Sequence, residues 1–81
     1  MVLAEPGRLT LLDIKTDAAV PATAAAVSPA YLDQLAVYRA LLRQAAPDHA
    51  VEAVLLYTAG PLRLALPGPL LDAALARITS A

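Results

Sequence analysis

The sequence predicts an α/β fold, in which a small mixed β-sheet with the element order β-β-α-β-β-α is covered by helices. Two aliphatic runs of strand length, 9–15 and 51–57, flank a segment whose apolar residues recur three and four positions apart. A strand, a helix and a second strand normally form a right-handed crossover with parallel strands. We therefore expect the two runs to be parallel neighbours, with shorter antiparallel strands outside them.

The N-terminal part of the chain predicts a β-hairpin. Met1–Ala4 forms the end of a strand, and Pro6 and Gly7 suit the two central positions of a type II turn. The strand Leu9–Lys15 follows; it is apolar on both faces, which is typical of a central, covered strand. Because the first strand is so short, we expect that the chain begins inside a hairpin of a longer domain.

Residues 16–27 lack periodicity and are predicted to form a loop, after which a helix begins. Ser28 suits the N-cap, Pro29 suits the first helical position, and Pro47 should end the helix near Ala46. The residues with helical spacing, which should form its buried face, are Leu32, Leu35, Tyr38, Leu42 and Ala45.

The second half of the chain predicts a strand, a turn, a strand and a helix. Val51–Tyr57 is strongly strand-like, 58–61 turns the chain, and Leu62–Leu66 returns as a short strand antiparallel to it. A last helix opens at Pro67. Its apolar stripe comprises Leu70, Leu71, Ala74, Leu75 and Ile78.

Composition limits the classes of function. Eighty-one residues make a single domain, 1–81, and 59% hydrophobic content predicts exposed apolar surface and self-association. With a net charge of −1 and dispersed Lys and Arg, the chain has no basic stripe that could hold DNA alone. The lack of cysteine suits a cytoplasmic location, and no apolar run reaches the roughly 20 residues of a membrane span.

Asp13 and Lys15 are the strongest candidates for chemistry. Residues two apart in a strand share a face, so these side chains project together, roughly 6.5–7 Å apart at Cα. They stand at the carboxyl end of an apolar strand beside a crossover, where α/β sheets often bind ligands. Asp13 and the carbonyl of Ile14 could bind Mg²⁺, and Lys15 could stabilise charge on a phosphate. The alternative is a plain surface ion pair.

Gln34 and Tyr38 form a second candidate pair, since residues four apart lie on one helix face. Tyr38 could equally pack in the core while Gln34 is solvated. Arg39 could face phosphate, although a solvated helix face is the more common role. Asp17 is expected to be a loop residue, and Tyr57 is expected to end a strand and pack.

Two motifs in order resemble the C-terminal nuclease domain of RecB and AddA, which belongs to the PD-(D/E)XK superfamily. Asp13-Ile14-Lys15 matches the (D/E)XK element, and Gln34-Leu35-Ala36-Val37-Tyr38 matches the Q-x-x-x-Y element of the RecB-like branch. The similarity continues through 51–57, and so implies a partial restriction-endonuclease-like fold.

The resemblance implies a fragment of a Mg²⁺-dependent DNA exonuclease coupled to a helicase in double-strand break repair. It implies that Asp13 and Ile14 bind the metal, that Lys15 is catalytic, and that Gln34 and Tyr38 support the site. The implied contacts to DNA are Thr16, Gln34, Tyr38 and Arg39. The first catalytic aspartate of the family lies on a preceding strand; we expect that this chain begins after that strand and is inactive alone. The resemblance also implies two partners, which are DNA, bound through the full-length protein, and a partner subunit of the helicase–nuclease complex. The alternative function is a non-catalytic oligomerisation or docking module.

Overall fold

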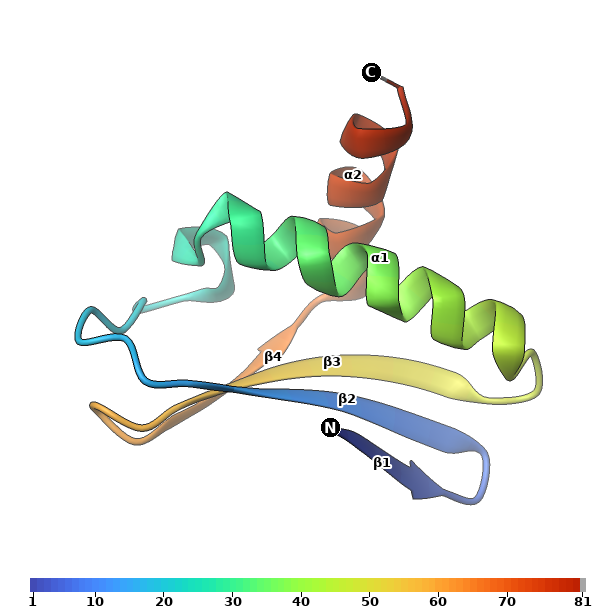
Figure 1. The fold of residues 1–81 in the computed structure, drawn as a ribbon, viewed down its shortest axis with the longest axis horizontal. Helices are drawn as coiled ribbons and strands as arrows, with labels where there is room; N and C mark the ends of the chain where they lie inside the picture. Colours follow the sequence, from blue (N-terminus) through green and yellow to red (C-terminus); the bar gives the residue numbers. More distant parts are fainter. Residues whose placement is uncertain (81) are drawn as a thin grey trace.

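One four-stranded sheet with the order β1-β2-β3-β4 forms the base of the computed structural model, which describes residues 1–80 (Figure 1). Central strands β2 and β3 are parallel, and each outer strand is antiparallel to its neighbour. This confirms the predicted mixed α/β sheet. The strands are β1 (Val2–Glu5), β2 (Arg8–Lys15), β3 (Ala50–Tyr57) and β4 (Leu62–Leu66).

The turn between β1 and β2 has the predicted chemistry. Gly7 has a φ of 76°, in the left-handed region that favours glycine, as the second central position of a type II turn requires. Across the turn, Arg8 forms an ion pair with Glu5 at 3.2 Å. The hairpin register then places Val2 opposite Leu11.

Helix α1 (Pro29–Ala45) is the crossover between β2 and β3, and α2 (Gly68–Thr79) follows β4. Ser28 occupies the N-cap of α1 as predicted, although its side chain makes no capping hydrogen bond. At the other end, the Ala46 N–H donates to the Leu42 carbonyl. The segment predicted as a loop contains one short 3₁₀-helix, η1 (Ala24–Ala26).

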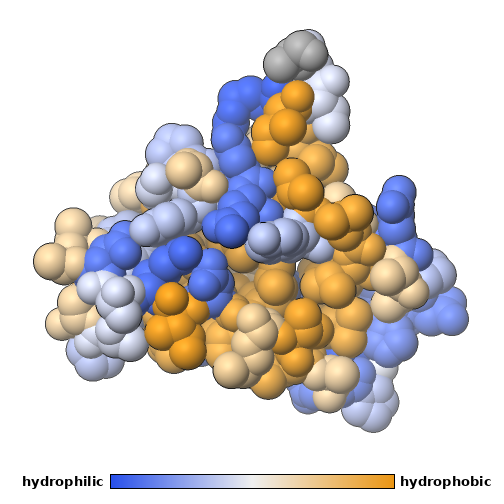
Figure 2. Space-filling view, in the orientation of Figure 1, coloured by the Kyte–Doolittle hydropathy of each residue, from blue (hydrophilic) through white to orange (hydrophobic). Residues whose placement is uncertain are grey.

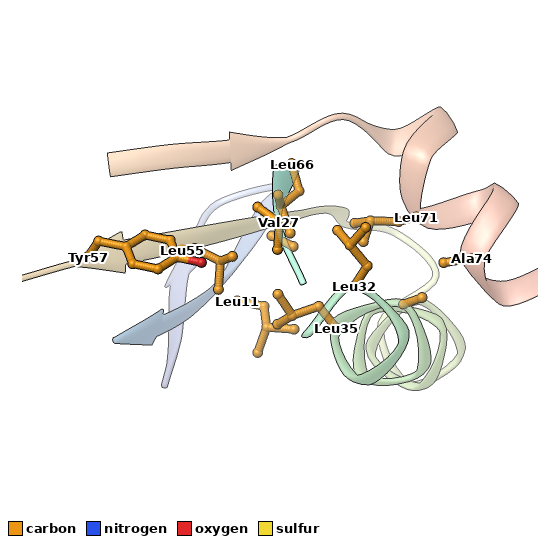
Figure 3. Close-up of a cluster of buried hydrophobic side chains, with 11 residues drawn as sticks. Leu11, Val27, Leu32, Leu35, Leu55, Tyr57, Leu66, Leu71 and Ala74 are labelled. Atoms are coloured by element: carbon orange, nitrogen blue, oxygen red, sulfur yellow. The ribbon is translucent and has the colours of Figure 1, made fainter. Parts of the chain in front are cut away.

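The hydrophobic core lies between one face of the sheet and both helices (Figure 3). Leu55 and Tyr57 from β3 are 0% and 2% exposed, and Leu35 from α1 is 1% exposed. Both helices therefore pack on the same face of the sheet, and no helix within residues 1–80 packs on the opposite face. The expectation that β2 is covered on both faces is wrong, because Ile14, on the opposite face, is 50% exposed.

The predicted buried face of α1 is only partly correct. Leu32, Leu35 and Ala36 are buried, whereas Tyr38 is 47% exposed and Ala45 is exposed. Tyr38 lies beside Val2, on the short edge strand β1, and the described chain has no strand beyond β1 to cover it. Helical spacing identifies a face of α1, but the width of the sheet decides how much of that face is buried.

Three ion pairs join the helices, the longest being Arg43 with Asp72 at 3.9 Å. The Arg39 guanidinium contacts Asp72 at 2.7 Å and donates to the Val51 carbonyl at 3.5 Å, and Arg77 pairs with Asp33. The Arg39 side chain is only 15% exposed. These contacts attach α2 to α1 and to the start of β3.

Candidate functional site

Asp13 and Lys15 lie side by side at the carboxyl end of β2. Strand alternation puts both side chains on the helix-covered face, and the Lys15 Nζ lies 3.0 Å from the Asp13 Oδ2. Both are partly shielded, with side chains 16% exposed for Lys15 and 32% for Asp13. The hydrogen bond to the Asp13 carboxylate raises the pKa of Lys15 above its usual 10.5, so the amine remains protonated at neutral pH.

The first turn of α1 contributes a third group. The Lys15 Nζ lies 4.0 Å from the centroid of the Tyr31 ring, which is within cation–π range. The Tyr31 hydroxyl donates a 2.8 Å hydrogen bond to the Asp17 Oδ2, which raises the pKa of Tyr31. Lys15 is thus held between the Asp13 carboxylate and the Tyr31 ring.

Sequence reasoning missed this role of Tyr31 and left Asp17 in the loop. Asp17 is only two residues beyond Lys15, but Tyr31 is fourteen residues beyond Asp17, so their contact depends on where the loop returns the chain. Strand and helix periodicity carry no information about such a contact. The available signal was the position of Tyr31, at the start of the helix that follows this strand.

The carbonyl of Ile14 lies at an unpaired edge of the sheet. The Leu12 carbonyl faces β1, where it accepts a hydrogen bond from the Met1 amino group, and the Lys15 carbonyl faces the other way, toward Thr58. Carbonyls alternate along a strand, so the Ile14 carbonyl points toward the β1 side. Because β1 pairs with β2 only as far as Leu11 and Leu12, this carbonyl has no strand partner there.

These oxygens are ligands of the kind that Mg²⁺ prefers, but they fit it only in part. Asp13 supplies one carboxylate and Ile14 one carbonyl, next to each other along β2. Within residues 1–80, no group of three Asp, Glu, His or Cys side chains is arranged to hold a metal ion. A cation held here would therefore need water or oxygen ligands from outside the described chain.

Gln34 and Tyr38 are exposed residues of α1 and line up with Tyr31 along one side of the helix. Tyr31 contacts Lys15, while Tyr38 lies beside Leu11, four residues earlier in β2. Gln34 lies between Tyr31 and Tyr38 along the helix and is exposed. Tyr38 lines a hollow with Val2 and Leu11 and is therefore separated from the acid–lysine pair.

The remaining predicted DNA contacts are divided between two places. Thr16 is exposed and directly follows the Asp13–Lys15 pair. Arg39, by contrast, uses its guanidinium to bind Asp72 and the Val51 carbonyl between the two helices. Arg39 is therefore not grouped with Asp13 and Lys15, and its contacts explain it as a structural residue.

A cavity of about 290 Å³ lies beside the pair. It is open to solvent and is bordered by the loop after β2, the first turn of α1 and the end of β3. Tyr57, at the end of β3, is 2% exposed as predicted, and its burial raises the pKa of its hydroxyl. The lining residues are Asp17, Ala19, Val20, Pro21, Ala26, Ser28, Tyr31 and Tyr57.

A second hollow, of about 340 Å³, lies between α1 and the strands β1 and β2. Its lining is largely apolar: Val2, Leu11, Tyr38, Leu41 and Leu42. Val2 and Leu41 are 46% and 56% exposed, which is high for large aliphatic side chains. Hydrophobic residues occupy much of the middle of the face shown in Figure 2.

In comparisons with known proteins, no family model, no curated protein and no solved structure matches this chain. Neither described helix is long and apolar enough to cross a membrane.

Proposed function

We propose that this chain is part of a metal-dependent DNA exonuclease domain of the PD-(D/E)XK type, in a helicase–nuclease that acts in double-strand break repair. The observation that supports it best is the Asp13–Lys15 pair at the carboxyl end of β2, 3.0 Å apart and partly shielded. The Gln34-to-Tyr38 motif on the adjoining helix supports it further. Asp13 is the one carboxylate assigned to the metal within residues 1–80, so we expect the chain to be inactive alone, and we propose that it acts with a partner subunit.

Each group has a distinct role in the proposed site. Asp13 and the Ile14 carbonyl would hold Mg²⁺, which when bound supplies Lewis-acid activation of a phosphodiester and of water. Lys15, kept protonated by its bond to Asp13, stabilises negative charge on the phosphate. Gln34 can donate from its amide to a DNA backbone oxygen at the same level of the helix. Thr16 and Tyr38 would extend the contact between protein and DNA along the DNA strand.

Metal binding can be tested without activity, using paramagnetic Mn²⁺ and NMR on the chain itself. We expect selective broadening of the amide signals of Asp13, Ile14 and Lys15. Asp13→Asn should remove this broadening, whereas Asp48→Asn, at an exposed turn outside the site, should leave it intact. Unchanged broadening in Asp13→Asn would show that Asp13 is not a ligand.

The activity test uses the protein encoded by the longer reading frame that the proposal assumes. That protein should degrade DNA only with Mg²⁺, and both Asp13→Ala and Lys15→Ala should lower the rate by at least about 100-fold, the range typical of lost charge stabilisation. Retention of full nuclease activity in either variant would refute the assigned site. The proposed cytoplasmic location predicts that this nuclease activity is found in the cytoplasmic fraction of a cell extract.

A second candidate function, self-association, is favoured by the edge strand β1. Its residues Val2-Leu3-Ala4 are exposed and apolar, with no Lys or Pro to discourage pairing, and its outer backbone edge has no strand partner in the described chain. A second copy could pair β1 with β1 in antiparallel fashion and cover the groove beside Tyr38 and Leu41. The proposed metal site is not part of this surface.

Self-association is tested by light scattering over a range of concentrations. The chain should form dimers, and Val2→Lys, which places a charge in the groove, should convert it to monomers. Arg63→Lys, on the opposite edge strand, is the matched control and should remain dimeric. A monomeric wild-type chain at high concentration would exclude this function.

A further inference from the structure

The cavity beside Asp13 and Lys15 has the size of a small ligand site. Its volume of about 290 Å³ is at the lower end of the range for ligand pockets, roughly 300 Å³ and above. Such a volume suits one flat ring system better than a peptide or an oligosaccharide. The cavity is therefore a site for a single compact group.

The walls of the cavity are mostly apolar and aromatic. Val20 and Pro21 come from the loop and Tyr31 from α1, whereas Tyr57, at the end of β3, is only 2% exposed and contributes little accessible surface. Aromatic rings and flat apolar surfaces favour a planar aromatic group, because every nucleobase can stack on them. The walls supply stacking but no selection among bases.

Two polar groups in the wall are uncommitted. The Asp17 Oδ2 accepts a hydrogen bond from the Tyr31 hydroxyl, and within residues 1–80 no hydrogen bond is donated to the Asp17 Oδ1. The Ser28 hydroxyl, which lines the same cavity, makes no capping hydrogen bond to α1. The cavity thus offers a charged acceptor and a hydroxyl that can donate or accept.

We propose that this cavity binds a nucleobase that carries an amino group, guanine above all, and discriminates against thymine. Guanine presents two neighbouring N–H donors to a carboxylate such as Asp17, and a carbonyl that the Ser28 hydroxyl can reach. Thymine has a single ring N–H between two carbonyls, whose lone pairs oppose the carboxylate. The selectivity follows from the negative charge of Asp17 in the cavity wall.

The cavity and the acid–lysine pair share Tyr31, whose ring contacts Lys15 and whose hydroxyl binds Asp17. A nucleotide whose base occupies the cavity can therefore bring its own phosphate toward Lys15. This inference rests on the proposed nuclease function for its biological substrate, a nucleotide at or near a DNA end. The binding preference itself belongs to the cavity and needs no metal.

The test is a metal-free NMR titration of the labelled chain with dGMP and with dTMP, which carry the same phosphate and differ in the base. We expect dGMP to shift the amide signals of Asp17, Ser28 and Tyr31, and to bind at least about tenfold more tightly than dTMP, as loss of one charge-assisted hydrogen bond predicts. Asp17→Asn should reduce the preference, while Asp48→Asn should preserve it. Ser28→Ala should weaken the binding of dGMP without unfolding the chain, because Ser28 is an exposed N-cap residue whose side chain makes no capping hydrogen bond.

Equal binding of the two nucleotides, no binding at millimolar concentration, or an unchanged dGMP preference in Asp17→Asn would overturn the proposal. The two proposals fail separately. Mn²⁺ broadening at Asp13 without a base preference would remove only the base site. A base preference without Mn²⁺ broadening would leave the base site and refute the metal assignment.

Discussion

Truncating Leu35 and Tyr38, neighbours on α1, should have very different effects on stability. Leu35 is 1% exposed inside the core, and Leu→Ala changes at such positions cost about 2–5 kcal/mol. Tyr38 is 47% exposed. Fully burying a large apolar side chain contributes about 1.5–3 kcal/mol, so roughly half of that, about 1 kcal/mol, is at stake in Tyr38→Ala.

Thermal unfolding followed by circular dichroism measures the Tm of both variants against the wild type. For a domain of this size, a loss of about 3 kcal/mol in Leu35→Ala corresponds to a fall in Tm of roughly 12–24 °C, and Tyr38→Ala should lower Tm by less than about 8 °C. If the two variants lose equal stability, then Tyr38 is buried in the core, which would contradict its exposure of 47%. The measurement needs a monomeric sample, since Tyr38 also lines the groove proposed for self-association.

Three further predictions concern the candidate site, the turn between β1 and β2, and an ion pair between the helices. The pKa values of three side chains are raised in the folded state, which therefore holds their protons more firmly: Lys15, Tyr31 and Tyr57. The free energy of unfolding should therefore fall as the pH rises above about 10. In a denaturation series at alkaline pH, Lys15→Met should make that fall less steep. Gly7→Ala should destabilise the fold by about 1 kcal/mol because of its φ of 76°, although there is free space for the added Cβ. In chemical denaturation, Asp72→Ala should cost less than about 1 kcal/mol, with the difference shrinking at high salt, since Asp72 is 61% exposed despite its pairing.

The fold could be predicted from the sequence because its elements are strongly patterned. The aliphatic runs of β2 and β3 and the helical spacing between them imply a parallel pair, and the register confirms it by placing Asp13 opposite Leu55. The Asp13–Lys15 neighbourhood follows from the two-residue repeat of a strand alone. These are local features, and a single sequence shows them directly.

The rest depends on contacts between distant parts of the chain. From the sequence, Arg39 is a helix residue that could contact phosphate, whereas in the structure α2 places Asp72 beside it. From the sequence, Asp17 is only a loop residue, whereas in the structure it accepts a hydrogen bond from the Tyr31 hydroxyl of α1. In both cases a charged group finds its partner 14 or more residues away, and periodicity cannot identify that partner.

The charges of the site suggest an order of binding. Counted by formal charge, Asp13, Asp17 and Lys15 together have a net charge of −1, which opposes a phosphate. A divalent cation would change this net charge to +1 and attract DNA. DNA binding by the active protein should therefore be much tighter with a divalent ion than without one, and Ca²⁺ should support it without cleavage. Fluorescence anisotropy with labelled DNA checks this, and Asp13→Asn, which brings the metal-free net charge to zero, should bind DNA more tightly without metal than the wild type does. Tight metal-free binding by the wild type would contradict the charge-based order.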